Sequence, residues 1–237
     1  MIIVQNLNKN YGHIEALKNI NFSIAKGELV FLLGPNGAGK STLMKLLTGY
    51  LSQESGNIEI FGRHFDKSAK EILSDIGYVP ENTPLYNEMS VYEYLDFLGK
   101  IRRLDSQKRQ ERIKELSHLF DLTSVLNQKC ETLSKGYKKR TAIAGGLMSN
   151  PKILILDEPT EGLDPNQKFT IRNFFKEYAK ENIVIISTHV MEEVTAFPSR
   201  VILLNKGRLI EDTSAQELSK LSPQNDLEEA FRQITGK

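Results

Sequence analysis

Short hydrophobic runs of two kinds divide the chain into predicted strands. Apolar and polar residues alternate over residues 22–24 and 58–60, which predicts half-buried antiparallel strands near the start of the chain. Residues 29–33 are apolar throughout and therefore predict a central strand that is buried on both faces. Three similar runs follow, separated by helix-like segments, and this rhythm is typical of an α/β sheet: residues 153–156, 183–186 and 201–204.

The hydrophobic spacing changes over residues 83–150, where apolar positions recur with the period of a helix. Residues 91–101 and 113–120 show this period most clearly. Asp105-Ser106 gives a start signal for the second of these helices, because Asp is a preferred N-cap. Asn150-Pro151 is expected to end a later helix, since proline disfavours helical geometry in the residue before it. The pattern therefore predicts a helical insert.

Further helix signals follow the insert. Asp164-Pro165 combines a cap residue with a first-turn proline and so predicts a helix start. Residues 214–217 match a capping box. Leu227, Phe231 and Ile234 share one helical face, which predicts a last amphipathic helix.

Composition narrows the function classes. The 237 residues are 40% hydrophobic and 26% charged, which is enough apolar material for a full core. Basic residues number 31 and acidic residues 30, so the formal net charge is only +1. No overall positive field attracts nucleic acid, and we do not expect a nucleic-acid partner.

Cysteine use and hydropathy bear on the expected location. Cys130 is the single cysteine and cannot form an internal disulfide. The chain begins with strand-like residues 2–4 rather than a signal-type segment, so we expect a reducing, cytoplasmic environment. No apolar run approaches the roughly 20 residues that cross a bilayer. If the protein serves a membrane process, another chain must span the membrane.

A glycine-rich segment between the apolar run 29–33 and a predicted helix carries the clearest chemistry. It satisfies the pattern G-x-x-x-x-G-K-[ST] in the strand and helix context that this pattern requires. Its backbone N–H groups are expected to cradle phosphates, with Lys40 reaching the β and γ phosphates and Ser41 ligating Mg²⁺. The alternative is a chance glycine turn. The predicted nucleotide-binding residues here are Gly34, Pro35, Asn36, Gly37, Ala38, Gly39, Lys40, Ser41 and Thr42.

Two acids follow the buried run 153–156. Asp157 and Glu158 are expected at the carboxyl end of a parallel strand, where ligands of α/β sheets bind. Asp157 is predicted to hold Mg²⁺, and Glu158 to orient and polarise the water that attacks the γ phosphate. The alternative is a pair of solvated acids at a strand end.

His189 follows another buried run, residues 183–186, and is expected to face the same crevice. We predict that its imidazole bonds the γ phosphate and helps to fix Glu158. A purely structural histidine is the alternative. The other three histidines have no such setting and are interpreted as surface residues: His13, His64 and His118.

Five motifs together resemble ABC transporter ATPases over essentially the whole chain. They are the phosphate loop, Leu133-Ser134-Lys135-Gly136-Tyr137, Leu156-Asp157-Glu158-Pro159, Gly162-Leu163-Asp164-Pro165 and Ser187-Thr188-His189. Two segments, Tyr78-Val79-Pro80-Glu81 and Ser134-Lys135-Gly136-Tyr137, are most similar to ABC-2 type exporter ATPases, including the subgroup associated with gliding motility.

The resemblance implies an α/β fold: a P-loop NTPase core with a mainly parallel sheet, an N-terminal antiparallel β subdomain and an inserted α-helical subdomain. The whole chain, residues 1–237, is then one ABC ATPase domain. Its expected parts are the ATP-binding core at 1–82 and 151–212, the helical signature subdomain at 83–150, and a C-terminal helical extension at 213–237.

The resemblance also assigns roles to single residues. Tyr11 is expected to stack on adenine, although it could instead pack at the end of the first strand. Ser134 and Gly136 are expected to bond the γ phosphate held by an opposite subunit, and Asp164 to lie at the dimer seam. Lys135 and Tyr137 depart from the commonest signature, Leu-Ser-Gly-Gly-Gln.

Glu81 stands where the family usually has glutamine. It is a candidate Mg²⁺ ligand whose charge favours the metal but repels the γ phosphate, or else a solvated residue that never reaches the metal. Tyr86 and Met89 are candidates for contact with a membrane partner or for packing within the helical lobe. Residues 138–140 form a basic run that we interpret as the solvated face of a helix.

The sequence thus predicts an ATP-hydrolysing subunit with ATP and Mg²⁺ as cofactors. By the resemblance, it works as a homodimer or heterodimer at the cytoplasmic face of the cell membrane and drives a separate transmembrane permease, in the direction of export. The alternatives are a soluble ABC ATPase acting on ribosomes or chromosomes, and a nucleotide-binding regulatory or assembly protein with little turnover.

Overall fold

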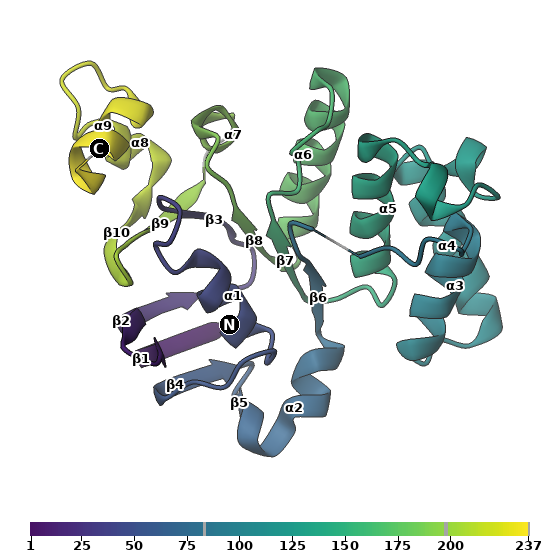
Figure 1. Cartoon of the computed structure of the whole chain (residues 1–237), viewed down its shortest axis with the longest axis horizontal. Helices are drawn as coiled ribbons and strands as arrows, with labels where there is room; N and C mark the ends of the chain where they lie inside the picture. The colour runs from purple at the N-terminus through teal and green to yellow at the C-terminus, as the bar shows by residue number, and fades with distance from the viewer. Residues whose placement is uncertain (83, 197–198, 237) are drawn as a thin grey trace.

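A six-stranded sheet runs through the centre of the molecule, for which the computed structural model describes residues 1–82, 84–196 and 199–236 (Figure 1). The strand order is β10-β9-β3-β8-β7-β6, with β10 antiparallel to β9 and the other neighbours parallel. The mainly parallel sheet predicted from the sequence is therefore present. The strands are β3 (Leu29–Leu33), β6 (Ile76–Val79), β7 (Ile153–Asp157), β8 (Ile183–Ser187), β9 (Arg200–Asn205) and β10 (Arg208–Ser214).

A second, antiparallel sheet lies at the N-terminal side. Its strand order is β2-β1-β4-β5, and both predicted alternating segments, 22–24 and 58–60, lie in strands antiparallel to β1. Ile24 and Ile60 pair with opposite sides of Ile2, which is fully buried. The strands are β1 (Ile2–Tyr11), β2 (Ile14–Ile24), β4 (Ser55–Ile60) and β5 (Arg63–His64).

Strand β3 is buried on both faces, as its uninterrupted apolar sequence predicts. Val30 and Leu32 join the core that contains helix α1 and the antiparallel sheet. Phe31 and Leu33 face the opposite core, which extends into the helical lobe. Because successive side chains of a strand point to opposite faces, one strand connects the two cores. Helix α1 (Lys40–Leu47) begins after the loop that follows β3.

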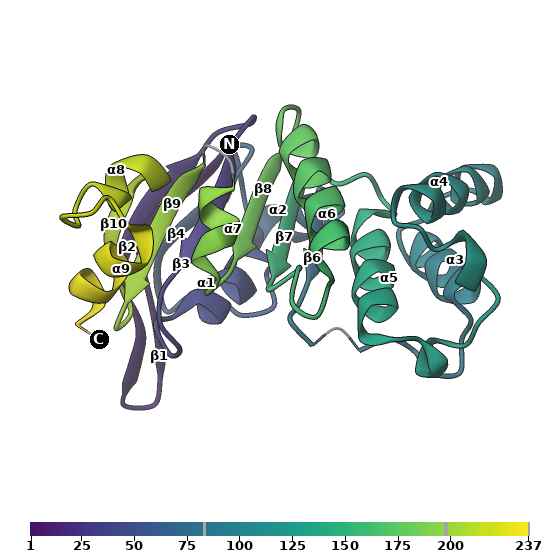
Figure 2. The ribbon, with the colours of Figure 1, turned by 90° about the horizontal axis from the view of Figure 1, so that it is seen from above.

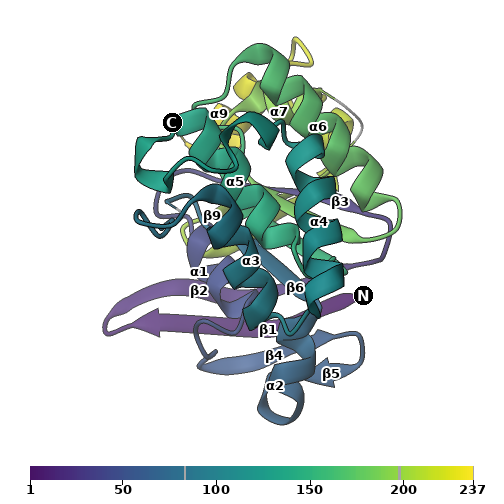
Figure 3. The ribbon, with the colours of Figure 1, turned by 90° about the vertical axis from the view of Figure 1, so that its right-hand side faces the viewer.

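A helical lobe lies at one end of the molecule, and the C-terminal helices lie at the other (Figure 2). Seen from the lobe's side, helices α3 and α4 stand in front of the rest of the chain (Figure 3). Thr83, the expected first residue of the insert, lies outside the described residues. The lobe contains α3 (Val91–Ile101), α4 (Ser106–Leu119), the short 3-10 helices η1 (Thr123–Val125) and η2 (Cys130–Thr132), and α5 (Lys135–Leu147).

Side-chain caps confirm the predicted helix starts. The Asp105 carboxylate accepts a bond from the backbone N–H of Lys108, and Asp164 forms a reciprocal capping box with Gln167. Ser214 likewise caps the helix after β10. The end of α5 differs from the prediction: the helix stops at Leu147, and Asn150 adopts a left-handed φ of 50° that asparagine tolerates well.

The remaining helices flank the sheet and form the C-terminal part. The last helix presents the predicted apolar face, since Leu227 is buried while Phe231 and Ile234 pack against the same core. Within the described ranges, no helix is long and apolar enough to span a membrane. These helices are α2 (Phe65–Ser74), α6 (Pro165–Ala179), α7 (Met191–Thr195), α8 (Ala215–Ser219) and α9 (Leu227–Thr235).

Candidate active site

The glycine-rich loop turns directly from β3 into α1. Gly39 is the N-cap residue of α1 and has a φ of 108°, and a Cβ there would lie 2.7 Å from the carbonyl oxygen of Ala16. Only glycine fits both the backbone conformation and the close contact. The first backbone N–H groups of α1 have no intrahelical partners, and Lys40, Ser41 and Thr42 line a cavity, as an anion site requires.

Lys40, the first residue of α1, folds back over this loop. Its ammonium donates to the carbonyl oxygens of Gly34 at 2.6 Å and Pro35 at 3.3 Å. Burial lowers the pKa of Lys40, and the nearby carboxylates of Glu158, Asp157 and Glu81 act in the opposite direction. The Lys40 cation is thus held beside the place where phosphate charge is expected.

Asp157 ends strand β7 and receives two hydroxyl groups. Ser41 donates to its Oδ2 at 3.5 Å, and Ser187, at the end of the neighbouring strand β8, donates to its Oδ1. The loop after β3 and the tips of β7 and β8 meet because these strands are adjacent and parallel. The structure therefore brings together two of the three residues predicted to hold Mg²⁺, Ser41 and Asp157.

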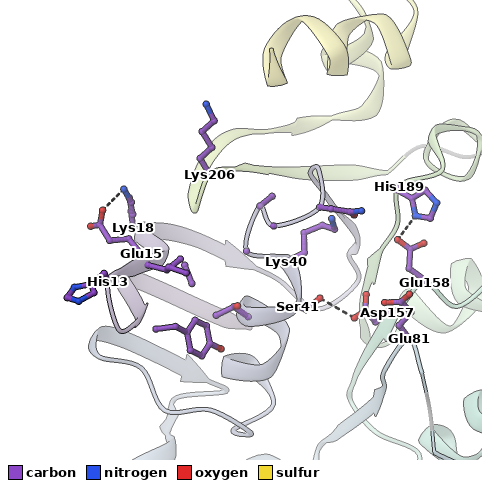
Figure 4. A pocket seen from close by; sticks show the side chains of 18 residues that line it. His13, Glu15, Lys18, Lys40, Ser41, Glu81, Asp157, Glu158, His189 and Lys206 are labelled. Carbon is purple, nitrogen blue, oxygen red and sulfur yellow. Dashed lines mark hydrogen bonds and ion pairs between the residues drawn. The ribbon is translucent and has the colours of Figure 1, made fainter. Parts of the chain in front are cut away.

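Glu158 and His189 form a hydrogen-bonded contact across two strand tips (Figure 4). The imidazole Nδ1 lies 2.7 Å from Glu158 Oε1, and this hydrogen bond raises the pKa of His189. Burial raises the pKa of Glu158, whereas the bond to His189 lowers it. Glu158 also has a left-handed φ of 46°, a conformation that costs free energy and is concentrated at functional sites.

Glu81 follows β6 and lies near Asp157 at the rim of the same cavity (Figure 4). Its backbone carbonyl oxygen accepts a bond from the Lys139 ammonium at 2.9 Å. The side chain faces the same space as Lys40, whose charge it influences. Glu81 is exposed, and its place in the cavity lining is compatible both with the predicted metal contact and with a solvated side chain, so the metal contact stays a prediction.

One cavity of about 840 Å³ connects these groups. Tyr11, which is 46% exposed, lines its outer part, and the Lys9 ammonium lies 5.9 Å from the Tyr11 ring centroid. The β1–β2 turn and the first residues of β2 add groups that the sequence did not assign to the site, because only the hairpin pairing brings them there. These are His13, Ile14, Glu15, Ala16 and Lys18, with Lys206 added from the β9–β10 turn.

Ser134 and Gly136 are outside the lining of this cavity. Ser134 is exposed and is the N-cap of α5, where its hydroxyl accepts a bond from the Tyr137 N–H at 3.3 Å. Gly136 sits close to α6, since a Cβ there would lie 3.1 Å from Gln167 Oε1. Contact of Ser134 and Gly136 with the phosphate of an opposite subunit stays a prediction.

The interpretation of residues 138–140 as a solvated helix face is wrong. Lys139 is 7% exposed and Arg140 is 5% exposed. The Arg140 guanidinium donates to the Phe120 carbonyl oxygen at 2.8 Å and lies over the Tyr137 ring. Helix α5 packs against α3, α4 and β6, so most of its circumference is covered and consecutive residues are buried.

Comparison with known proteins identifies the family. Residues 17–161, more than half of the chain, match the family described as ABC transporter. An uncharacterized ABC transporter ATP-binding protein of Bacillus subtilis, YxlF, is 36% identical over 95% of this chain and 75% of its own length. The lantibiotic transport ATP-binding protein SrtF of Streptococcus pyogenes is also 36% identical, over 89% of each chain.

Solved structures agree with this assignment. A structure described as the ATP-binding subunit of an ABC transporter superposes with a TM-score of 0.90 at 26% identity, covering 99% of both chains. A dimeric ATP-binding cassette in a post-hydrolysis state, bound to ADP and Pi, gives a TM-score of 0.79 at 28% identity over 90% of this chain and 97% of that one. These likenesses confirm the α/β fold and the resemblance inferred from the motifs. The chain belongs to the ABC transporter family, as an ATP-binding subunit that hydrolyses ATP.

Proposed function

We propose that this subunit binds MgATP in the 840 Å³ cavity and uses its hydrolysis to drive export through a separate permease. The observation that carries the proposal is the convergence of the phosphate loop with Asp157, Glu158 and His189 at adjacent strand tips. A relative named for lantibiotic transport supports the transport role over action on ribosomes or chromosomes.

The donor set suits Mg²⁺ held partly by the nucleotide. The Ser41 hydroxyl and the Asp157 carboxylate supply hard oxygen ligands on one side of the cavity, with Glu81 as a third candidate at its rim. The described part of the chain contains no group of three or more His, Cys, Asp or Glu residues that would hold a metal alone. Mg²⁺ commonly keeps waters and phosphate oxygens as ligands, so this sparse set fits it. When bound, the ion would neutralise charge on the β and γ phosphates.

The chain's own residues have separable roles in hydrolysis. The backbone N–H groups at the start of α1 and the Lys40 ammonium bind the phosphates. The Glu158 carboxylate orients the attacking water and accepts its proton, and burial, which raises its pKa, favours that role. His189 holds Glu158 through the 2.7 Å contact and presents its other ring nitrogen to the γ phosphate.

We further propose that two cassettes close over the nucleotide. The opposite cassette, a copy of this chain or a related one, would supply the hydroxyl of Ser134 and the backbone of Gly136. Asp164 caps α6 in this chain and would lie at the seam. Tyr11, exposed at the cavity's outer part, would stack on adenine.

The permease would engage the helical lobe from the membrane side. Tyr86 is 51% exposed, and its ring lies edge-on to the ring of Phe97 with 5.2 Å between the ring centroids. Met89, in contrast, packs against the lobe core. Tyr86 is therefore the better contact candidate of the two. The proposed parts remain the core at 1–82 and 151–212, the lobe at 83–150 and the extension at 213–237, with the subunit peripheral on the cytoplasmic face of the membrane.

The test is ATPase activity combined with partner capture. We expect phosphate release from ATP that requires Mg²⁺ and stops with EDTA. A tagged chain purified from its native membranes in mild detergent is expected to carry a polytopic membrane protein that stimulates this activity. Recovery of ribosomal or chromosomal proteins in place of the membrane chain would contradict the transport role.

A further inference from the structure

Glu193 is a buried carboxylate near Glu158 and His189, and it has no assigned role in the proposed hydrolysis. It lies in helix α7 and is only 2% exposed. A buried charge is costly unless it is paired and hydrogen-bonded. The hydrogen-bond partners of Glu193 therefore indicate its role.

Both oxygens of Glu193 bind hydroxyl groups from the two catalytic loops. Thr160, two residues after Glu158, donates to Oε1. Thr188, the residue before His189, donates to Oε2 at 3.0 Å. Thr160 and Thr188 are 4% and 0% exposed, so water does not compete for these bonds. One carboxylate thus joins the loop after β7 to the loop after β8.

Arg172 of α6 provides charge compensation at a longer distance. Its Nη2 atom lies 3.9 Å from Glu193 Oε1, and its side chain is mostly buried. Burial raises the pKa of Glu193, while the Thr188 hydroxyl and the Arg172 guanidinium lower it. The carboxylate therefore lies near a cation from α6, while its hydrogen bonds go to the two loops.

The Thr188 hydroxyl lies between the carboxylates of Glu193 and Glu158. It lies 3.0 Å from Glu193 Oε2 and 3.4 Å from Glu158 Oε2, but it has only one proton to donate. The shorter distance favours donation to Glu193. The Val190 N–H donates to the same hydroxyl oxygen at 3.1 Å, which fixes the turn that carries His189.

We propose that Glu193 is a positioning residue for ATP hydrolysis, which holds the loops after β7 and β8 at the separation that lets His189 contact Glu158. Glu193 is not among the residues that line the cavity, and it acts through that contact. This inference rests on the proposed roles of Glu158 and His189. Because catalysis is sensitive to displacements of about 1 Å, losing this link is expected to reduce turnover more than ATP binding.

The test compares three variants of the full chain. Glu193→Leu keeps the approximate volume but accepts no hydrogen bond, and we expect kcat to fall about ten- to hundredfold with KM for ATP changed less than about threefold. Glu193→Gln retains one accepting oxygen and is expected to recover most of the loss. Glu192→Gln, an exposed carboxylate on the same helix, is the matched control and is expected to keep wild-type kinetics.

A double-mutant cycle with His189→Ala separates positioning from general destabilisation. On the His189→Ala background, the contact that Glu193 maintains is already lost, so Glu193→Leu is expected to cost less than about threefold in single-turnover phosphate release. An equal loss on both backgrounds, or equal losses for Leu and Gln, would overturn the proposal. If Glu193→Leu does not fold, Thr160→Val and Thr188→Val remove the same bonds singly, and wild-type kcat in both would overturn it equally.

Glu158→Gln, measured in parallel, distinguishes this inference from the function on which it rests. Loss of activity in Glu158→Gln with wild-type kcat in Glu193→Leu would reject only the role of Glu193. Retained activity in Glu158→Gln would reject the catalytic assignment itself.

Discussion

The proposed ATP site has two parts, the ends of strands β7 and β8 and the start of helix α5. Only the first part is complete within this chain. At the strand tips, Asp157 and Glu158 are bonded to groups from neighbouring strands. At the start of α5, the Ser134 hydroxyl bonds only within its own helix turn and is exposed. The proposed catalytic groups are therefore preorganised within one subunit, whereas Ser134 and Gly136 would, as proposed, need a second subunit to reach a phosphate.

Removing the catalytic carboxylate tests the preorganised half and has the largest expected effect. Glu158→Gln keeps the side-chain shape but cannot accept the proton of the attacking water, so we expect kcat to fall about a thousandfold. ATP binding should survive, and a stable ATP-bound dimer should accumulate, visible by size exclusion with light scattering. Glu161→Gln, three residues further along, is the control and should stay within about threefold of wild type. Turnover that persists in Glu158→Gln would show that the strand tips are not the catalytic half.

Arg140 tests whether the buried basic residues of α5 hold the lobe together. Arg140→Ala leaves the buried carbonyl oxygen of Phe120 without its donor, which is expected to cost about 2 kcal/mol in the free energy of unfolding. Urea denaturation measures this loss. The neighbouring Lys138→Ala should change stability by less than about 0.5 kcal/mol, because Lys138 is only partly buried. Equal losses in both would mean that burial of Arg140 contributes nothing.

Ser134 tests the incomplete half directly. Ser134→Ala is expected to weaken ATP-driven dimerisation about tenfold, measured in the Glu158→Gln background, while ATP binding to the monomer changes less than twofold. The substitution also removes an N-cap, which costs about 1 kcal/mol of stability. Ser90→Ala removes the equivalent cap from α3 in the same lobe and controls for that loss. Equal weakening of dimerisation by both variants would assign the effect to capping.

The strand tips could be predicted from sequence because the signals there are local. An apolar run followed by Asp157 and Glu158, or by His189, identifies a buried strand and the group at its end. Glu193 has no such signal, since its burial depends on Thr160 and Thr188 from distant segments. Its short helix offers no period that would separate it from its exposed neighbour Glu192.

The lobe was predictable in outline but not in its polar interior. The apolar period of residues 91–101 fixes helix α3, and Asp105 fixes the start of α4. Periodicity cannot reveal that α5 is covered on several sides, so the sequence predicts solvent exposure for Lys139 and Arg140. Their actual positions depend on tertiary acceptors, the carbonyl oxygens of Glu81 and Phe120.

Glu81 lies where the two regions meet and has the smallest expected effect. Its side chain reaches the catalytic cavity, while its carbonyl oxygen is held by Lys139 of α5. Glu81→Gln keeps that backbone bond and removes one negative charge near the phosphates, so kcat at saturating Mg²⁺ should stay within about threefold. The apparent affinity for Mg²⁺ should fall a few-fold, because a neutral oxygen binds the ion less strongly.

The control for Glu81→Gln is a variant that breaks the hydrogen bond between Lys139 of α5 and the Glu81 carbonyl oxygen. Lys139→Met removes the ammonium that holds the Glu81 carbonyl oxygen but leaves the Glu81 carboxylate in place. If charge is what Glu81 contributes, a Mg²⁺ titration of ATPase activity shifts in Glu81→Gln and not in Lys139→Met. If the position of Glu81 is what matters, the Mg²⁺ titration shifts more in Lys139→Met. The hydrogen bond from α5 to the Glu81 backbone then affects the affinity of the site for Mg²⁺. Complete loss of turnover in Glu81→Gln at saturating ATP and Mg²⁺ would instead make Glu81 part of the essential catalytic half.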